Sequence, residues 1–347
     1  MQIRDSKIGL KQPPSIVAEM SGNHNHSIER ALQIVEAAGN AGAQMLKLQT
    51  YTPDTITLDL DKDEFVISDP ESLWVNRSLY SLYKEACTPW KWHKPIMSRA
   101  NELGMVCFSS VFDESSVDFL EDLEVPAYKI ASQECVHHPL IRKVASTGKP
   151  IVMSTGMATL SEIDEAVNLI RKTGSSEILL MKCTSSYPAN PENSNVLTIP
   201  YLKKVFGCEV GLSDHTAGIG AAVAAVAHGA TMIEKHFTLS RADGGVDSAF
   251  SLEPLEMRHL VEETKRAWQS LGEVFFGPTE AEIPSLSGRR SLYISQDMRS
   301  GEQFNMENLR VIRPNQGLSP KYHDVVLGRT VNKDVTKGTP LSWELIA

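Results

Sequence analysis

Up to about residue 240, the chain repeats one pattern: a short apolar run with a polar end, followed by an amphipathic segment of helical period. The apolar runs predict eight strands, at residues 16–19, 45–49, 105–109, 127–130, 151–153, 178–182, 210–212 and 232–234. Helices are expected between them, for example over 27–41, with Ser27 as the N-cap, and over 161–172, opened by a Ser-Glu-Ile-Asp turn. Eight alternating strand–helix units favour a TIM barrel over an open doubly wound sheet.

Two parts of the chain depart from this rhythm. The second and third strands are separated by residues 51–92, which are rich in aromatics (LWVNRSLYSLYKEACTPW). Long loops in compact domains are often lids or binding loops, although a loop that only packs its own aromatic side chains is the alternative. A stretch rich in Pro, Ser and Gly at 278–288 is predicted to link a barrel domain, 1–277, to a small β-rich domain, 289–347, where short β-like runs (SLYIS, LRVIRP) replace the helical period.

Composition and charge exclude several classes of partner. The 34 Lys and Arg residues against 43 Asp and Glu residues give a net charge of -9, which repels a nucleic-acid backbone, so no nucleic acid is expected. The most apolar stretch, 221–230, is far shorter than the roughly 20 residues needed to span a bilayer, and predicts a buried, Ala-rich helix. The 5 cysteines are scattered without a CxxC pair, and the N-terminal residues lack a secretory pattern. We therefore expect a cytoplasmic protein with no membrane association.

Polar residues follow each of the eight predicted strands. TIM-barrel enzymes carry their chemistry at the C-terminal ends of the strands, so these residues are the first candidates for a site. Any one of them could simply cap a loop, but their recurrence at all eight ends indicates a catalytic face. The candidates are Glu19, Lys47, Gln49, Ser110, Lys129, Ser132, Glu134, Ser154, Tyr187, Ser213, His215, Glu234, Lys235 and His236.

The types of these residues indicate an anion site beside a metal site. Lysines at positions 47, 129 and 235, with the serine hydroxyls, suit a phosphate or carboxylate. The sequence has no GxxxxGK[ST] loop, so a nucleoside triphosphate is not implied. His215 and His236 follow adjacent strands and could hold a divalent transition metal, completed by Glu234, Asp247 or solvent, unless they are ordinary buried histidines. His24 and His26 could lie in the site or only in its loops.

A series of ordered phrases then identifies a family resemblance. AEMSGNHNHS, KLQTYTPDT, FSSVFD, YKIASQE, STGMATLSEI, KCTSSYPA, GLSDHT and IEKHFTLSR resemble the sialic acid synthase family, which makes nonulosonic acids from phosphoenolpyruvate. The C-terminal SLYISQDMRSGEQF through KGTPLSW is similar to that family's SAF, or antifreeze-like, domain. The aromatic segment and EKHFTLSRADGGVDSAFSLEP most resemble the branch that makes pseudaminic acid.

The resemblance implies roles for individual residues. Phosphoenolpyruvate would be bound by Lys47, Ser110, Lys129, Ser132, Ser154 and Ser213. A divalent metal, manganese or a similar ion such as magnesium or cobalt, would be held by His215 and His236. The sugar would contact Gln49, Glu134, Tyr187 and Asp247, and Glu19 would handle a proton. Arg313, from the C-terminal domain, would enter the site of the neighbouring subunit in a domain-swapped homodimer.

The implied reaction condenses phosphoenolpyruvate with the open-chain aldehyde of a diacetamido-trideoxy hexose and water, and releases phosphate. Two alternatives remain open at this point. One is the same chemistry on another amino sugar, giving legionaminic or N-acetylneuraminic acid. The other is a non-catalytic sugar-binding or ice-binding protein, because a fold alone does not establish catalysis.

Overall fold

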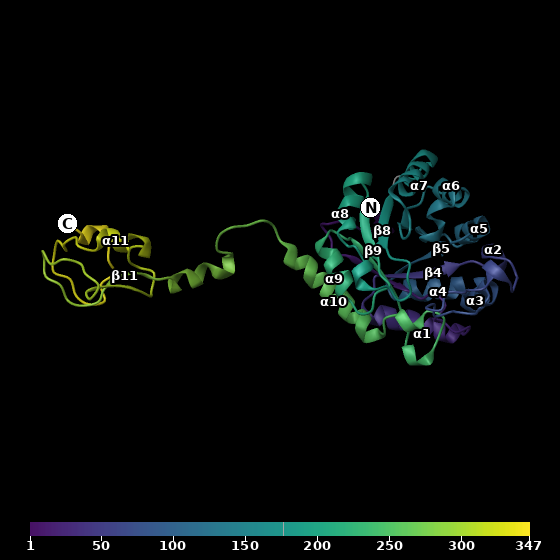
Figure 1. Ribbon diagram of the computed structural model, residues 1–347, viewed down its shortest axis with the longest axis horizontal. Helices are drawn as coiled ribbons and strands as arrows, with labels where there is room; N and C mark the ends of the chain where they lie inside the picture. The colour runs from purple at the N-terminus through teal and green to yellow at the C-terminus, as the bar shows by residue number, and fades with distance from the viewer. Residues whose placement is uncertain (176) are drawn as a thin grey trace. The chain divides into compact units, whose positions relative to one another are not determined.

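The computed structural model describes residues 1–175 and 177–347, which form two compact units, Met1–Gly272 and Glu273–Ala347. In the described part of the first unit, eight parallel strands close into a barrel (Figure 1), which confirms the predicted fold class. The strands are β3 (Ser15–Glu19), β4 (Met45–Thr50), β5 (Val106–Val111), β6 (Tyr128–Ile130), β7 (Ile151–Ser154), β8 (Ile178–Cys183), β9 (Glu209–Ser213) and β10 (Met232–His236). Strand β10 pairs with β3 and completes the ring.

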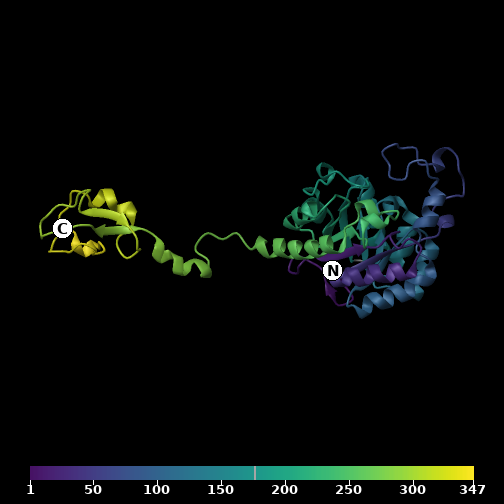
Figure 2. The same ribbon diagram turned by 90° about the horizontal axis from the view of Figure 1, so that it is seen from below.

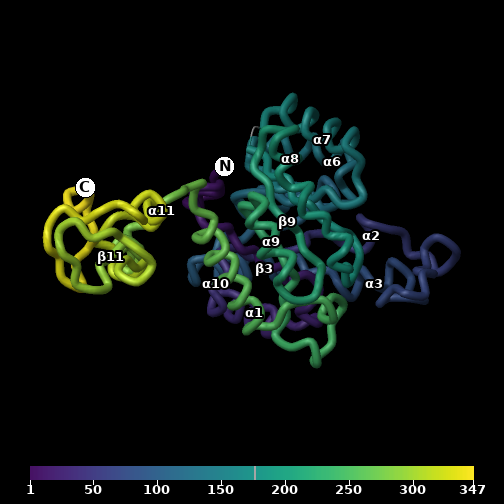
Figure 3. Tube along the Cα trace, turned by 60° about the vertical axis from the view of Figure 1, so that its left-hand side comes forward, coloured from purple at the N-terminus to yellow at the C-terminus, as the bar shows by residue number. Residues whose placement is uncertain are grey.

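Helices cover the outside of the barrel. Figure 3 shows α6, α7 and α8 following one another along it, and Figure 2 shows α1 (purple) and α10 (green) side by side. The helices after the strands are α1 (Ile28–Ala41), α4 (Trp90–Glu102), α5 (Glu114–Asp122), α6 (His138–Ser146), α7 (Leu160–Thr173), α8 (Thr198–Phe206), α9 (Gly220–Ala227) and α10 (Pro254–Leu271). The segment between β4 and α4 adds α2 (Pro53–Ile56) and α3 (Leu79–Ala86), and a hairpin of β1 (Gln2–Ile3) and β2 (Ser6–Lys7) precedes the barrel.

The predicted helix starts are partly confirmed. Ser27 caps α1, because its hydroxyl accepts a hydrogen bond from the backbone N–H of Arg30 at 3.1 Å. Helix α7 begins earlier than predicted, since its N-cap is Thr159 and not the Ser-Glu-Ile-Asp turn. The Thr159 hydroxyl accepts from the N–H of Glu162, whose carboxylate accepts from the N–H of Thr159 at 2.7 Å. Sequence reasoning overlooked this capping box.

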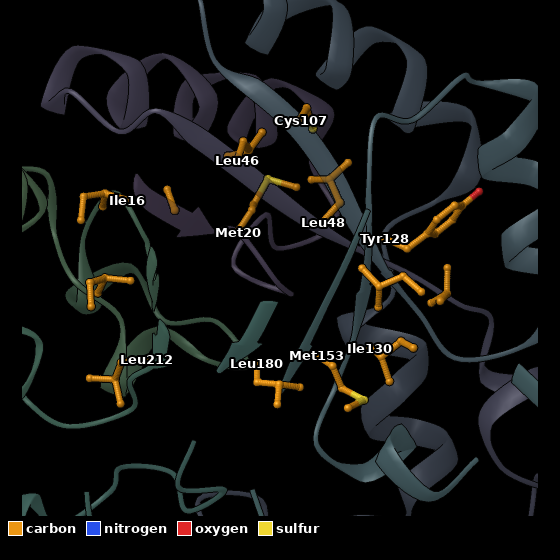
Figure 4. Close-up of a cluster of buried hydrophobic side chains, with 14 of the residues drawn as sticks. Ile16, Met20, Leu46, Leu48, Cys107, Tyr128, Ile130, Met153, Leu180 and Leu212 are labelled. Atoms are coloured by element: carbon orange, nitrogen blue, oxygen red, sulfur yellow. The ribbon is translucent and has the colours of Figure 1, made fainter. Parts of the chain in front are cut away.

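Side chains alternate between two cores along each strand. The outward positions pack against the helices, as Figure 4 shows for Leu46, Leu48 and Leu180. The inward positions at the lower end of the barrel form a second apolar cluster, which includes Met45, Phe108, Leu179, Met181 and Met232. Because the side-chain period of a strand is two, every second residue points inward along its whole length. Nearer the C-terminal ends, these inward positions carry polar residues.

The Ala-rich helix predicted within 221–230 is α9, but only one of its faces is buried. Ala222, Ala225 and Val226 pack inward, whereas Ala224 and Ala227 are exposed. Small apolar residues tolerate exposure, so composition alone overstated the burial of this helix. No helix of 1–175 or 177–347 is long and apolar enough to cross a membrane.

The second unit has its own small core. Strands β11 (Ser291–Ile294) and β12 (Leu309–Ile312) pair antiparallel, at the two predicted β-like runs. Buried residues such as Leu292, Phe304 and Val331 pack together there, beside the single-turn helix α11 (His323–Val326). The predicted linker, 278–288, contains a 3-10 stretch at Glu280–Gly288.

Candidate active site

A polar cavity opens at the C-terminal ends of the barrel strands. Most of the predicted site residues line it: Lys47, Gln49, Ser110, Lys129, Ser132, Ser154, Tyr187, Ser213, His215, Glu234 and His236, together with Phe112, Ala131, Gln133 and Cys183. Those on strands sit at inward positions above the lower apolar cluster, in phase with it. The fold therefore brings together, in one cavity, residues from seven strand ends that lie far apart in the sequence.

Two buried lysines converge on one carboxylate at the base of this cavity. Lys129 Nζ lies 2.9 and 2.8 Å from the two carboxylate oxygens of Glu234, and Lys47 Nζ lies 3.6 Å from one of them. Burial raises the pKa of Glu234, but the two ammonium groups outweigh burial and hold its pKa at about 2. Burial likewise lowers the pKa of Lys129, against the opposing effect of Glu234. A negatively charged ligand entering here would meet both ammonium groups at close range.

Glu19 is not among the residues that line the cavity, but it anchors a chain of polar side chains behind the lining residues Lys47 and Gln49. Its carboxylate lies 2.8 Å from Lys47 Nζ and accepts a hydrogen bond from Gln49 Nε2 at 3.0 Å. Gln49 also donates to the hydroxyl of Ser21, which in turn donates to Asp247. Burial raises the pKa of Glu19 above its ordinary value, although Lys47 opposes this effect. Glu19 is therefore suited to exchange a proton, since a raised pKa brings its two protonation states closer in free energy.

His215 and His236 lie side by side, with ring centroids 5.3 Å apart. The backbone carbonyl of Thr184 lies 2.9 Å from Nδ1 of His215, which leaves Nε2 of this ring for a ligand. Nδ1 of His236 is buried and has no hydrogen-bond partner in the described part of the chain. Burial and the neighbouring His215 lower the pKa of His236 well below its ordinary value, so its imidazole is neutral and able to bind a cation.

The residues present fit an open metal site rather than a closed one. Across residues 1–175 and 177–347, no three His, Cys, Asp or Glu side chains are arranged to enclose an ion. The nearest carboxylate to His236 is Asp247, with Oδ2 3.7 Å from Nδ1. Glu234, which sequence reasoning considered as a third ligand, is instead engaged by Lys129 and by the hydroxyl of Ser213 at 3.1 Å. Two imidazoles would thus supply the protein ligands, and water or substrate the remainder.

The serines predicted to bind an anion differ in how they are engaged. Ser110 accepts a hydrogen bond from Lys47 at 3.0 Å, and Ser132 accepts one from the backbone N–H of Gly156 at 3.1 Å. The hydroxyl of Ser154 is buried and finds no partner among the described residues. A buried hydroxyl without a partner is costly, so Ser154 is available to donate to a ligand oxygen.

One candidate was placed wrongly by sequence reasoning. Lys235 points away from the cavity, where its ammonium group lies 2.8 Å from Asp214 and 2.7 Å from the carbonyl of Thr216. It occupies the outward phase of β10, between the inward Glu234 and His236. Strand alternation excludes Lys235 from the anion site even though its sequence neighbours face it.

Other candidates lie outside the lining of the cavity. Glu134 belongs to the 3-10 turn Gln133–Val136, and burial raises the pKa of its carboxyl group to about 7. His24 and His26 belong to the loop that follows β3, where their rings pack against each other with centroids 5.9 Å apart. Arg313 is exposed in the second unit, in a hollow that it shares with Arg289 and Arg290.

Sequence reasoning missed four lining residues, Phe112, Ala131, Gln133 and Cys183, and two aromatic neighbours. Cys183 lines the cavity, with its sulfur 3.9 Å from Nδ1 of His215, and hydrogen bonding with that ring is one of the factors that lower its pKa to about 7. Its phase on β8, two positions after Met181, could have revealed it. Phe112 and Gln133 follow strands β5 and β6, and no pattern singled them out. Trp74 and Phe250 pack around Tyr187, and they come from loops whose contacts the sequence does not specify.

Comparison with known proteins establishes the family. The model of the NeuB family matches residues 34–275, and that of the SAF domain matches residues 289–347. The chain belongs to the NeuB family. The resemblance seen in the sequence is thereby confirmed over both parts of the chain, and the eight-stranded barrel with its C-terminal SAF domain is the architecture that this family membership predicts.

Members of the NeuB family match most of this chain. A pseudaminic acid synthase from Campylobacter jejuni is 41% identical over 94% of this chain and 94% of its own length. An N,N'-diacetyllegionaminic acid synthase from Legionella pneumophila is 34% identical over 95% of this chain and 94% of its own. A crystal structure of an N-acetylneuraminic acid synthetase from Leptospira borgpetersenii, in complex with citrate, is 31% identical, with a TM-score of 0.73 over 82% of this chain and 94% of that one.

Proposed function

We propose that this chain is a pseudaminic acid synthase. It condenses phosphoenolpyruvate with the open-chain aldehyde of 2,4-diacetamido-2,4,6-trideoxy-β-L-altropyranose and with water, and releases pseudaminic acid and phosphate. The observation that carries the proposal is the convergence of Lys47 and Lys129 beside His215 and His236 in one cavity. The identity of 41% to the Campylobacter jejuni enzyme, over 94% of both chains, supports this choice among nonulosonic acids.

Phosphoenolpyruvate binds at the lysine end of the cavity. Its negative charges are attracted to Lys47 and Lys129, which at present are balanced by Glu19 and Glu234. The hydroxyl of Ser154 donates to a phosphate or carboxylate oxygen, which satisfies a group that is otherwise buried without a partner. The remaining hydroxyls, those of Ser110, Ser132 and Ser213, complete the set of donors.

The acceptor sugar lies at the histidine end, against Gln49 and Tyr187, with Glu134 and Asp247 behind them. A divalent cation such as manganese, magnesium or cobalt, bound by His215 and His236, would polarise the aldehyde oxygen as a Lewis acid. The protein itself orients the aldehyde carbon toward C3 of phosphoenolpyruvate. Residues that hold two reactants in this way lower the entropic part of the barrier.

Glu19 manages the proton of the attacking water. The electron pair of the C2=C3 double bond forms the bond between C3 and the aldehyde carbon, water adds at C2, and the aldehyde oxygen takes up a proton to become a hydroxyl. The C2 hydroxyl then loses its proton as the bond between C2 and the phosphate oxygen breaks, which gives the ketone and phosphate. The carboxylate of Glu19 accepts the proton of this water, and Lys47, 2.8 Å away, stabilises the negative charge that the carboxylate carries before the transfer. Lys129 stabilises the charge of the departing phosphate.

The second unit contributes Arg313 to a neighbouring subunit in a domain-swapped homodimer. This part of the proposal rests on the family resemblance of the IRPNQGL phrase. The side chain of Arg313 is exposed, and its planar guanidinium suits the carbonyl oxygens of the acetamido groups.

A phosphate-release assay tests the proposed function. Phosphoenolpyruvate is incubated with the protein, a divalent cation and one of three sugars: the altro diacetamido sugar, its manno counterpart and N-acetylmannosamine. We expect the first to give the highest kcat/KM. A preference for the second or third would assign the chain to legionaminic or N-acetylneuraminic acid synthesis, and no phosphate release with any sugar would contradict the proposal as a whole.

A further inference from the structure

The aromatic segment between β4 and α4 contacts the acceptor end of the cavity through Trp74. Its indole Nε1–H donates a hydrogen bond to the backbone carbonyl of Val246 at 2.9 Å. Val246 precedes Asp247 in the loop between β10 and α10. A segment that leaves the barrel after the second strand of the ring is thereby fastened to the loop that follows the eighth.

Trp74 also packs on the wall of the cavity. Its ring centroid lies 5.7 Å from that of Tyr187, which lines the cavity, and 6.4 Å from that of Phe250. Phe250 in turn lies 4.9 Å from the ring of His236 and 5.3 Å from Tyr187. Trp74, Tyr187 and Phe250 form an aromatic cluster beside the two histidines, and such ring pairs are held by burial and by edge-to-face contact.

We infer that Trp74 is a specificity-determining residue for the acceptor sugar, which acts by positioning Tyr187. Trp74 does not itself line the cavity, whereas Tyr187, against which its ring packs, does. The hydrogen bond to Val246 and the contact with Phe250 hold the indole in place. Without the ring, Tyr187 would lose this support, and the contacts that distinguish one acceptor from another would weaken. The inference rests on the proposed function and adds to it a residue that discriminates between acceptors.

Replacement of Trp74 should change acceptor kinetics and leave phosphoenolpyruvate kinetics almost unchanged. For Trp74→Ala, we expect the KM for the altro diacetamido sugar to rise at least tenfold, within the 10–200-fold range typical of an altered apolar contact. The KM for phosphoenolpyruvate should stay within about twofold, because the anion end of the cavity lies at Lys47 and Lys129. The ratio of kcat/KM for the altro diacetamido sugar to that for N-acetylmannosamine should fall toward one.

Two further variants separate the ring from its hydrogen bond and from general destabilisation. Trp74→Phe keeps an aromatic ring but removes the N–H, so we expect it to retain most of the preference. Trp268→Ala is the matched control, because Trp268 is also half-buried and also donates its indole N–H to a backbone carbonyl, that of Leu10, at 2.9 Å. It lies on α10, away from the cavity lining, and should leave both KM values unchanged.

The outcomes distinguish this inference from the proposed function. If the unaltered protein releases no phosphate with any acceptor, the proposed function fails. If it is active and Trp74→Ala keeps the wild-type acceptor preference, only the inference fails. It is equally overturned if Trp74→Phe behaves as Trp74→Ala does, since the hydrogen bond to Val246, and not the apolar ring, would then control the acceptor.

Discussion

Lys129 binds both carboxylate oxygens of Glu234, at 2.9 and 2.8 Å, and both side chains are almost fully buried. The two residues are 105 positions apart and come from β6 and β10. The charge of each residue offsets the free-energy cost of burying the charge of the other. Variants at this pair therefore affect both substrate binding and stability, and the two effects need to be separated.

Lys129→Ala should raise the KM for phosphoenolpyruvate at least tenfold and change the KM for the sugar much less, because it removes a charge-assisted contact to an anion. It should also lower the free energy of unfolding by about 3 kcal/mol or more, since Glu234 keeps a buried charge. Urea unfolding and steady-state kinetics measure the two effects. Lys129→Met combined with Glu234→Gln should recover most of the stability but not the activity.

The surface pair of Lys143 and Asp118 provides the control for this experiment. Lys143→Ala should change the free energy of unfolding very little, as is typical of an exposed ion pair, and should leave both KM values unchanged. Equal effects of Lys129→Ala on both substrates would contradict the assignment of Lys129 to phosphoenolpyruvate.

His215→Ala or His236→Ala should abolish turnover without unfolding the protein. Each substitution removes one of two protein ligands from an open metal site. We therefore expect kcat to fall by more than the roughly 10–100-fold that is typical when a residue only supports a metal ligand. Metal content after dialysis, measured by mass spectrometry, should fall in parallel. His259→Ala, on the exposed face of α10, is the control. A variant at 215 or 236 with full metal content and a normal rate would show the metal assignment to be wrong.

Arg313 should act in the site of the neighbouring subunit. Arg313→Ala and Glu19→Ala subunits, each inactive or nearly so alone, are mixed and allowed to exchange. Half of the dimers would then carry both variants, and each of these would have one intact site, so roughly a quarter of the wild-type activity should return. Arg310→Ala, an exposed arginine on β12, should remain active. If exchange is verified by mass and activity stays absent, Arg313 does not act between subunits.

Stability should fall as the pH drops below about 6.5, in part because of His24. Its Nδ1 accepts a hydrogen bond from the backbone N–H of His26 at 3.2 Å, and burial together with His26 lowers its pKa to about 4. A lowered pKa in the folded state means that the unfolded chain binds the proton first, so stability present above pH 6.5 is lost as the pH falls toward 4.

Because the pKa of His24 is about 4 in the folded protein and about 6.5 in the unfolded chain, its protonation should lower the free energy of unfolding by about 2.5 kcal/mol between pH 7.5 and 4.5. Urea unfolding of the wild type and of His24→Gln at both pH values measures it, because the variant should lose less stability than the wild type over this interval. His259→Gln, exposed on α10, should behave as the wild type does. The same pH dependence in His24→Gln and the wild type would exclude His24 as a cause.

The barrel and most of its site could be predicted from the sequence because both depend on local periodicity. Apolar runs of strand length marked all eight strands, and most of the polar residues predicted at their ends line the cavity, among them Lys47, Ser154 and His236. A barrel turns such order along the chain into a ring of neighbouring strand ends, so the positions of these residues follow from the fold itself.

Tertiary structure alone decided which neighbours these residues have. Lys235 was misplaced because its orientation depends on the phase of β10, and the pairing of Lys129 with Glu234 depends on strands that are not adjacent in the ring. The position of Trp74 over Tyr187 depends on two loops that meet only once the barrel has closed. Periodicity specifies which face of an element is buried, whereas the partners across a cavity are chosen by packing between distant parts of the chain.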